Sequence, residues 1–286
     1  MAFKPDDIPG SLREAYAHRR CSLYVGAGLS QGAGLPSWAG LLHELIDYTD
    51  SNLPAFRDRV PEYRKLVDDP SKFLMLATEL KEVLLGSFND YIDKRFGDRS
   101  LKYTANHELL VRLAGLRFMI TTNYDSLIED AFIAATSKRV PTYNYRQVGT
   151  VQRHLVKQEF FIFKAHGDAE TVGEGIILTE QDYRKLMFEQ RAYQSLLASM
   201  FTMTTMIFVG ASMADPELRL LLQFISSAFE TDGPQHFAVM AEEDMGMVEM
   251  ERWRKDFNVQ FIPISKANNY EDLTLLLNEL ASIPAA

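Results

Sequence analysis

Six short apolar runs, separated by sequence of helical character, constrain the fold of this chain more than any other feature. Most of them are continuously apolar instead of alternating, which is typical of parallel strands that helices cover on both faces. We therefore predict an α/β fold built on a doubly wound, mostly parallel sheet. The predicted strands are CSLYVG (21–26), LRFMITT (116–122), FFIFKA (160–165), MIFVG (206–210), HFAVMA (236–241) and VQFIPI (259–264).

Helices are predicted between these strands, and one of them has a clear beginning. Asp215 is placed to be its N-cap, and Pro216 follows at the first helical position. Right-handed crossovers put the strand-to-helix turns along one edge of the sheet, at the carboxyl ends of the strands. The predicted helices cover residues 38–49, 126–135, 215–229, 244–257 and 270–281.

Two segments break the alternation of strands and helices. Residues 50–105 are polar and helical in character, and residues 175–203 suggest a short strand followed by helices. We predict one domain over residues 1–286, with a helical insertion at 50–105 and a smaller one at 175–203, which together form a helical cap beside the sheet. Residues 136–154 hold five Lys, Arg or His residues and no acid. We interpret them as a solvated loop, with contact to phosphate or nucleic acid as the alternative.

Composition limits the partners and the location of the chain. The net charge of −9, from 30 basic and 39 acidic residues, lacks the basic surplus of a nucleic-acid-binding protein. Cys21 is the single cysteine, which excludes an intrachain disulfide and suits a buried thiol in the reducing cytoplasm. The first ten residues lack the apolar core of a signal peptide. Residues 192–214 carry no charge but too many Ser, Thr and Gln side chains for a membrane span.

A glycine-rich turn follows the first predicted strand. Gly26, Ala27, Gly28 and Ser30 lie in the sequence GAGLS, where glycine permits a tight turn and a close approach of a ligand to the backbone. The N–H groups at the beginning of a following helix can then bind phosphate. The third glycine of the usual dinucleotide-binding pattern is replaced by Gln31. A purely structural turn is therefore the alternative.

Polar or small residues also follow three other predicted strands. Asn123 and Asp125 can face a crevice at the end of their strand, or they can cap the next helix. His166 suits general-base catalysis, or it is a structural histidine with satisfied hydrogen bonds. Gly210 and Ser212 belong to a small-residue turn that admits a nucleotide. Four such turns at one edge of a sheet indicate a binding site more strongly than any one of them.

These turns also carry a resemblance to a known family. In this order along the chain, GAGLS, GLPSW (34–38), TTNYD, KAHGD and GAS resemble the Rossmann-like NAD-binding core of sirtuins. ILTEQDYRKL (177–186) and GASMADPEL (210–218) are similar to patterns of the sirtuin-like NAD hydrolases of bacterial antiphage defence. The resemblance implies that NAD is the substrate.

The resemblance also implies a role for each matching residue. Asn123 would orient the nicotinamide ribose and the attacking water, and Asp125 would face the nicotinamide carboxamide. His166 would be the general base near the ribose hydroxyls. The other residues would contact the rest of the dinucleotide: Gly26, Ala27, Gly28 and Ser30 at the pyrophosphate and adjoining ribose, and Gly210 and Ser212 on the adenosine side.

One departure from the sirtuins affects the predicted reaction. Sirtuin deacylases carry a zinc module of two CxxC pairs, which a chain with one cysteine cannot form, so no zinc or other metal is expected and binding of an acyl-lysine peptide is in doubt. We predict hydrolysis of NAD to nicotinamide and ADP-ribose. We expect this activity to be gated by homo-oligomerisation or by a partner such as a HerA-type ATPase. The alternatives are an NAD-dependent deacylase or ADP-ribosyltransferase, and a non-catalytic subunit that binds NAD or ADP-ribose.

Overall fold

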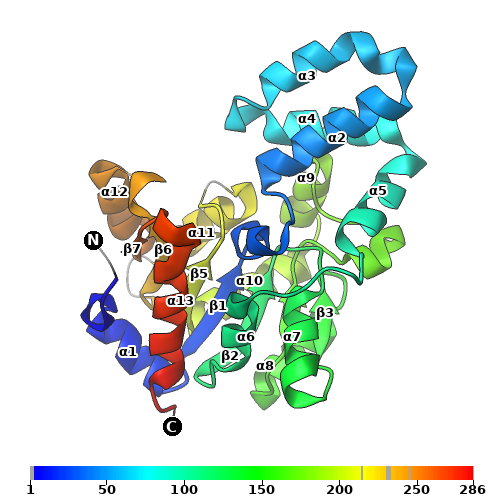
Figure 1. The fold of residues 1–286 in the computed structure, drawn as a ribbon. Coiled ribbons are helices and arrows are strands. Elements are labelled where there is room, and N and C mark those ends of the chain that lie inside the picture. The colour runs from blue at the N-terminus through cyan, green and yellow to red at the C-terminus, as the bar shows by residue number, and fades with distance from the viewer. Residues whose placement is uncertain (1–2, 214, 230–232, 245, 286) are drawn as a thin grey trace.

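The computed structural model describes residues 3–213, 215–229, 233–244 and 246–285, and its centre is a parallel sheet of seven strands (Figure 1). The strand order is β3-β4-β2-β1-β5-β6-β7, so β2, β3 and β4 form one side of β1 and the later strands β5, β6 and β7 form the other. The predicted doubly wound α/β fold is therefore confirmed. The strands are β1 (Cys21–Val25), β2 (Leu116–Thr121), β3 (Thr142–Asn144), β4 (Ile162–Lys164), β5 (Thr205–Val209), β6 (His236–Ala241) and β7 (Val259–Ile264).

All six predicted strands are confirmed, but the interpretation of residues 136–154 as a solvated loop was wrong. This segment contains the edge strand β3 and the first part of a helix. Tyr143 of β3 lies over Phe161, with 6.4 Å between the ring centroids, and Val151 of the helix is fully buried. The apolar residues Val148, Val151 and Leu155 recur at helical spacing, a signal that the many basic residues obscured.

The five predicted helices are confirmed as α2, α7, α11, α12 and α13. The short strand expected at the beginning of residues 175–203 does not form: residues 175–178 are irregular and lead to Thr179, the N-cap of the next helix. The helices are α1 (Gly10–Ala17), α2 (Trp38–Asn52), α3 (Val60–Leu66), α4 (Phe73–Leu84), α5 (Gly86–Phe96), α6 (Ala105–Val111), α7 (Leu127–Thr136), α8 (Val148–Lys157), α9 (Glu180–Phe188), α10 (Arg191–Met203), α11 (Pro216–Phe229), α12 (Met247–Phe257) and α13 (Ala267–Ser282).

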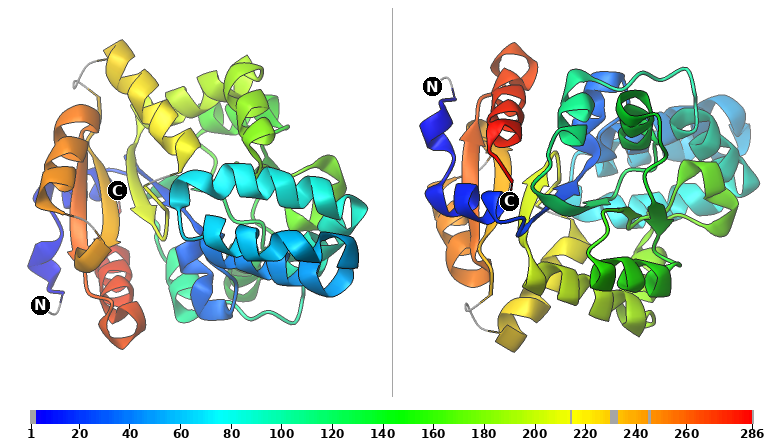
Figure 2. Two further views of the ribbon diagram at one scale, coloured as in Figure 1. Left: turned by 90° about the horizontal axis from the view of Figure 1, so that it is seen from above. Right: turned by 90° about the horizontal axis from the view of Figure 1, so that it is seen from below.

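Helices cover both faces of the sheet, as the continuously apolar strands predict. Leu23 and Val25 of β1 pack in one cluster with α1, α6 and α13, whereas Tyr24 points to the opposite face and packs with residues of α10 and α11. The views from above and below show the sheet between these two layers of helices (Figure 2). Successive side chains along a strand point to opposite faces of the sheet, so one apolar strand contributes to a hydrophobic core on each face.

A lobe formed by α2, α3, α4 and α5 rises beyond the carboxyl ends of the strands (Figure 1). Its own apolar core includes Leu42 and Leu80, both fully buried, and it also takes in Tyr124 and Leu178 from turns that border the sheet. The lobe is thus packed directly onto the segment that follows β2. The division into one domain with insertions at residues 50–105 and 175–203 stays a prediction.

Two further observations bear on the sequence analysis. None of the helices that the structure describes is long and apolar enough to cross a membrane, and most of residues 192–214 belong to α10 and β5. Cys21 is a free, fully buried thiol, and burial raises its pKa to about 12. The interpretation of Cys21 as a buried thiol is confirmed.

His107 and His236 are buried, and the loss of contact with water favours their neutral forms. Burial lowers the pKa of both His107 and His236 to about 4. His107 lies at the third position of α6, where its Nδ1 accepts the backbone N–H of Thr104 at 3.1 Å. Its Nε2 is buried with no hydrogen-bond partner among the described residues. Protonation of His107 would therefore place an uncompensated charge in the core.

We predict that His107→Gln makes the stability of the protein less dependent on pH. The stabilisation by neutral His107 is complete above its unfolded pKa of 6.5 and is lost as the pH falls toward its folded pKa of about 4. Between pH 7 and pH 5 this loss amounts to about 2 kcal/mol. Glutamine at this position keeps the bond to Thr104 and does not titrate. Urea unfolding at both pH values measures the difference, and an equal loss in both proteins would contradict this account.

Candidate active site

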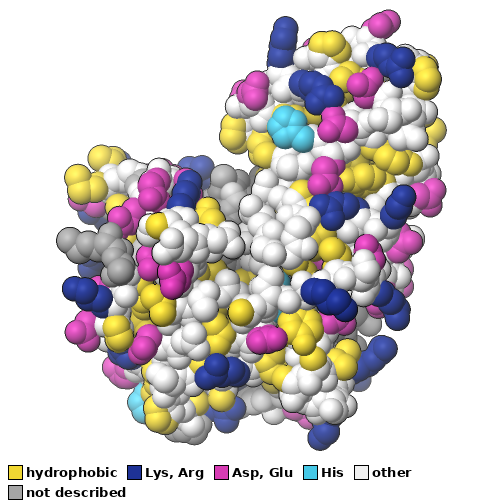
Figure 3. All heavy atoms as spheres, in the orientation of Figure 1, with side chains coloured by type: hydrophobic (Ala, Val, Ile, Leu, Met, Phe, Trp, Pro, Cys, Tyr) yellow, Lys and Arg dark blue, Asp and Glu magenta, His cyan; other side chains and the backbone are white. Residues whose placement is uncertain are grey.

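A cavity of about 350 Å³ opens at the carboxyl ends of β1, β2, β4 and β5. The lobe supplies its other wall through Trp38, Leu41 and Phe96. The space-filling view shows a notch between this lobe and the part of the molecule that carries α12 and α13 (Figure 3). Every site residue predicted from the sequence lines this one cavity: Gly26, Ala27, Gly28, Ser30, Asn123, Asp125, His166, Gly210 and Ser212.

A larger cavity of about 910 Å³ adjoins the first one on the side of β6 and β7. The two share Gly28, Gln31, Gly210, Ala211, Met240 and Asp244, so they meet at the turns after β1 and β5 and at the carboxyl end of β6. The larger cavity is lined by neither Asn123 nor His166. Of the two cavities, Asn123 and His166 therefore line only the smaller one.

The turns after β1 and β5 are packed backbone against backbone. The N–H of Gly26 donates to the carbonyl of Val209 at 3.0 Å, and the N–H of Gly28 donates to the carbonyl of Gly210 at 2.9 Å. A Cβ on Gly26 would lie 2.5 Å from the Cα of Ala211. The alternative of a structural turn is thus confirmed for these two glycines, whose N–H groups are already bonded to the protein. Because these glycines have no side chain, a ligand can approach their backbone closely.

The side chain of Asn123 is bonded to Ser30 at the floor of the cavity. The Nδ2 of Asn123 donates to the Oγ of Ser30 at 3.0 Å, and the Ser30 side chain opposes the rise in the pKa of Asp125. This arrangement leaves the Oδ1 of Asn123 buried without a partner among the described residues. An acceptor left unpaired in this way is costly unless a ligand satisfies it.

Asp125 also has a structural role. Its Oδ1 accepts the backbone N–H of Leu127 at 3.1 Å, at the beginning of α7. The N-cap of α7 is Ser126, which makes no side-chain cap hydrogen bond, and Asp125 bonds the first N–H of the helix from the position before it, whereas the side chain of Asn123 bonds to Ser30. Burial raises the pKa of Asp125, and the nearby Lys164 ammonium opposes that rise.

His166 follows β4, the strand that pairs with β2 in the sheet. Its side chain is only 4% exposed, and its ring meets the edge of Tyr183 with 5.3 Å between centroids. The hydroxyl of Tyr183 donates a long hydrogen bond of 3.5 Å to Asp215. Asp215 in turn accepts the N–H of Leu218 at 3.3 Å, which confirms its predicted place as the N-cap of α11. His166 is thus held by the helices that cover this face of the sheet.

Sequence reasoning missed three residues at or beside the cavity. Trp38 and Tyr183 line it, and the indole Nε1 of Trp38 is buried without a partner among the described residues. Lys164 is fully buried beneath the cavity. The signal for Lys164 was a lysine within the apolar strand FFIFKA, and Trp38 and Tyr183 lie within the patterns GLPSW and ILTEQDYRKL that carried the resemblance. Within the described ranges, no group of three or more His, Cys, Asp and Glu residues is placed to hold a metal ion.

The fold and the cavity are those of an open, doubly wound α/β protein with a candidate ligand site. In open doubly wound sheets the ligand lies beyond the carboxyl ends of the strands, where the strand order reverses, and β1 and β5 flank that point here. The model of the SIR2-like domain family matches residues 117–262, just over half of the chain. The chain belongs to the SIR2-like family.

Individual relatives extend the likeness over most of the chain. The NAD(+) hydrolase ThsA of Bacillus cereus (strain MSX-D12) is 28% identical over 273 residues, which are 91% of this chain and 53% of that protein. The NAD(+) hydrolase ThsA of Enterococcus faecium is 26% identical over 79% of this chain and 44% of its own. The chain thus spans about half the length of these relatives. A solved structure of Sir2 with an inhibitor and 2′-O-acetyl-ADP-ribose covers 92% of both chains, with 15% identity and a TM-score of 0.39.

We predict that Gly210→Ala destabilises the fold. Gly210 has a φ of +61°, and an added Cβ would lie 2.5 Å from the backbone nitrogen of Leu29. The two turns must separate, at a cost of about 3 kcal/mol or more. The control is Gly149→Ala in α8, where a Cβ meets nothing within 4 Å and should stabilise the helix by up to about 1 kcal/mol. Urea unfolding compares both variants with the wild type, and equal midpoints for the two would contradict this assignment.

Proposed function

We propose that this chain is an NAD glycohydrolase that cleaves NAD to nicotinamide and ADP-ribose. The observation that carries the proposal is that Asn123, whose buried Oδ1 has no partner among the described residues, lines the same cavity as His166. A hydrogen-bond acceptor and a proton acceptor on residues of one site suit the activation of a water molecule. The name NAD(+) hydrolase of four relatives in the same family supports this reaction.

The two adjoining cavities suit a dinucleotide. Their volumes of about 350 and 910 Å³ fall within the range of small-molecule sites. In the proposed mode, the nicotinamide and its ribose occupy the smaller cavity and the adenosine occupies the larger one. The pyrophosphate then crosses the shared boundary near Gly28 and Gly210, where the absence of a side chain permits close contact. Gly26, Ala27 and Ser30 border the same crossing. Ser212, for which the resemblance implied the adenosine side, lines only the smaller cavity and in this mode lies on the nicotinamide side of the crossing.

The proposed reaction breaks the bond between C1′ of the ribose and the pyridinium nitrogen. The electron pair of that bond leaves with nicotinamide, which departs as a neutral molecule, and the water oxygen bonds to C1′. The water gives one proton to His166, which passes it to solvent. Asn123 orients the water and the ribose through its Oδ1, and Asp125 faces the carboxamide. The transition state resembles an oxocarbenium ion, so fixed dipoles and the exclusion of other water lower the barrier.

The proposal includes a setting for the activity. Unrestrained hydrolysis would deplete cellular NAD, so we propose that this chain is a gated effector of antiphage defence in the cytoplasm. Self-assembly into a homo-oligomer or contact with a partner such as a HerA-type ATPase would supply the gate. The resemblance of the motifs to sirtuin-like NAD hydrolases of antiphage defence supports this setting.

We predict that Asn123→Ala and His166→Ala each lower the rate of NAD hydrolysis by at least about 100-fold, because general-base catalysis contributes roughly 10²–10⁴-fold. Both variants should unfold cooperatively like the wild type. Chromatography of NAD, nicotinamide and ADP-ribose measures the reaction, with and without candidate partners. Retention of near-full hydrolysis by both purified variants would contradict the assignment.

The same assay separates hydrolysis from the other candidate activities. NAD consumption that requires an added acyl-lysine peptide or protein would indicate a transferase instead. Thermal stabilisation by NAD or ADP-ribose with no turnover under any condition would indicate a binding subunit. Either result would overturn the proposed hydrolase.

A further inference from the structure

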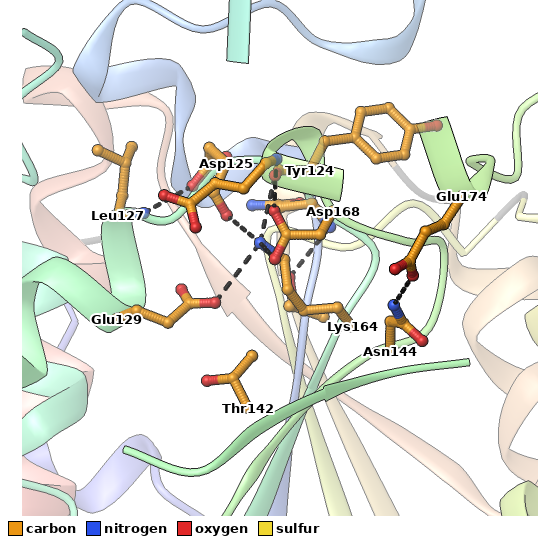
Figure 4. A network of polar contacts seen from close by, with 12 residues as sticks. Tyr124, Asp125, Leu127, Glu129, Thr142, Asn144, Lys164, Asp168 and Glu174 are labelled. Carbon is orange, nitrogen blue, oxygen red and sulfur yellow. Dashed lines mark hydrogen bonds and ion pairs between the residues drawn. The ribbon is translucent and has the colours of Figure 1, made fainter. Parts of the chain in front are cut away.

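A buried ammonium group lies directly beneath the candidate active site. Lys164 is the last residue of β4, and its side chain is 1% exposed. Its Nζ lies 2.8 Å from the carbonyl oxygen of Asp125, 3.2 Å from that of Tyr124, and 3.0 Å from Oδ2 of Asp168. Glu129 of α7 lies at 3.5 Å (Figure 4). The three donors of one ammonium are thus surrounded by oxygens from three separate segments.

These contacts join the two turns that carry Asn123 and His166. The turn after β2 is held at the carbonyls of Tyr124 and Asp125, the two residues that follow Asn123. The turn after β4 is held through Asp168, two residues beyond His166. A backbone hydrogen bond of 3.0 Å from Ala169 to the carbonyl of Tyr124 adds a second link between the same turns. Asp168 also accepts the N–H of Glu170, which fixes its carboxylate.

The charges around Lys164 maintain its ionised form. Burial alone would lower the pKa of Lys164, but the carboxylates of Glu129, Asp168 and Asp125 hold it above its ordinary value. A charge buried this deeply costs several kcal/mol of desolvation, so it is tolerated only where many oxygens surround it. A neutral residue could fill the same space, but it could not donate to both carbonyls and to Asp168 at once.

We propose that Lys164 is a positioning residue that sets the distance between Asn123 and His166 for the proposed NAD hydrolysis. This inference rests on the proposed function and assigns Lys164 no contact with NAD, because Lys164 does not line the cavity. It acts through the two turns that it joins. A displacement of about 1 Å between reacting groups can cost roughly 100-fold in rate.

The first test is Lys164→Met, which keeps an unbranched side chain of similar volume and removes the ammonium. We expect kcat for NAD to fall by at least about 100-fold, while KM and the Kd of ADP-ribose change by less than about 3-fold. The glycine turns that we assign to the pyrophosphate make no contact with Lys164, so binding should persist. Amide hydrogen exchange should become faster in peptides covering residues 122–126 and 165–169 and remain unchanged in residues 26–30.

Lys164→Met leaves Glu129 and Asp168 without their counter-ion, which can itself prevent folding. The combined variant Lys164→Met, Glu129→Gln, Asp168→Asn removes these charges and keeps the side-chain volumes. Its partner is the double variant Glu129→Gln, Asp168→Asn, which retains the Lys164 amino group and its bonds to both carbonyls, because even a neutral amine has two N–H groups. We expect the double variant to keep at least about a tenth of the wild-type kcat and the triple variant to lose at least about 100-fold. Equal kcat values for the two would overturn the proposal.

Lys81→Met is the matched control. Lys81 forms an ion pair of 2.8 Å with Asp182 and lines neither cavity, so its loss should leave kcat within about 3-fold of the wild type. A folded Lys164→Met protein with kcat within about 3-fold of wild type would overturn the role of Lys164 and leave the proposed hydrolase intact. If the wild type hydrolyses no NAD, the proposed function fails, and hydrogen exchange alone decides whether Lys164 holds the two turns. Unchanged exchange in both turns would then refute the proposal.

Discussion

The close contact between the turns after β1 and β5 is the constraint on which the rest of the site depends. Parallel strands bring these turns to the same edge, but they can touch only where neither carries a side chain. Gly28 and Gly210 meet this condition, with the N–H of Gly28 bonded to the carbonyl of Gly210 at 2.9 Å. This contact closes the space between β1 and β5, so the cavities lie above the sheet and not within it.

Asn123 illustrates how a side chain is fixed by its neighbours. Asp125 is tied to α7 through Leu127, and the amide of Asn123 donates to Ser30. Because the amide nitrogen is bonded to Ser30, the oxygen is the atom of this side chain that has no partner among the described residues. The cost of that unpaired group is accepted at a site where a ligand can satisfy it.

Much of the fold and of the candidate site could be predicted from the sequence, because both depend on local patterns. Continuously apolar strands indicated a parallel sheet, and turns after parallel strands must share an edge, which is why all nine predicted residues line one cavity. The edge strand β3 was missed because it has only three residues and its burial depends on Phe161, far along the chain. Lys164 was missed for a related reason. A lysine in an apolar strand is informative only when its distant carboxylates are known, and Glu129 belongs to another element.

The burial of Cys21 at the centre of the sheet has a practical consequence. The thiolate is the reactive form of cysteine, and a thiol with a pKa of about 12 is almost entirely protonated near neutrality. The folded chain therefore offers alkylating reagents and oxidants no reactive sulfur from its single cysteine. Unfolding exposes that sulfur to solvent, so the extent of maleimide labelling of Cys21 measures the fraction of molecules that have unfolded.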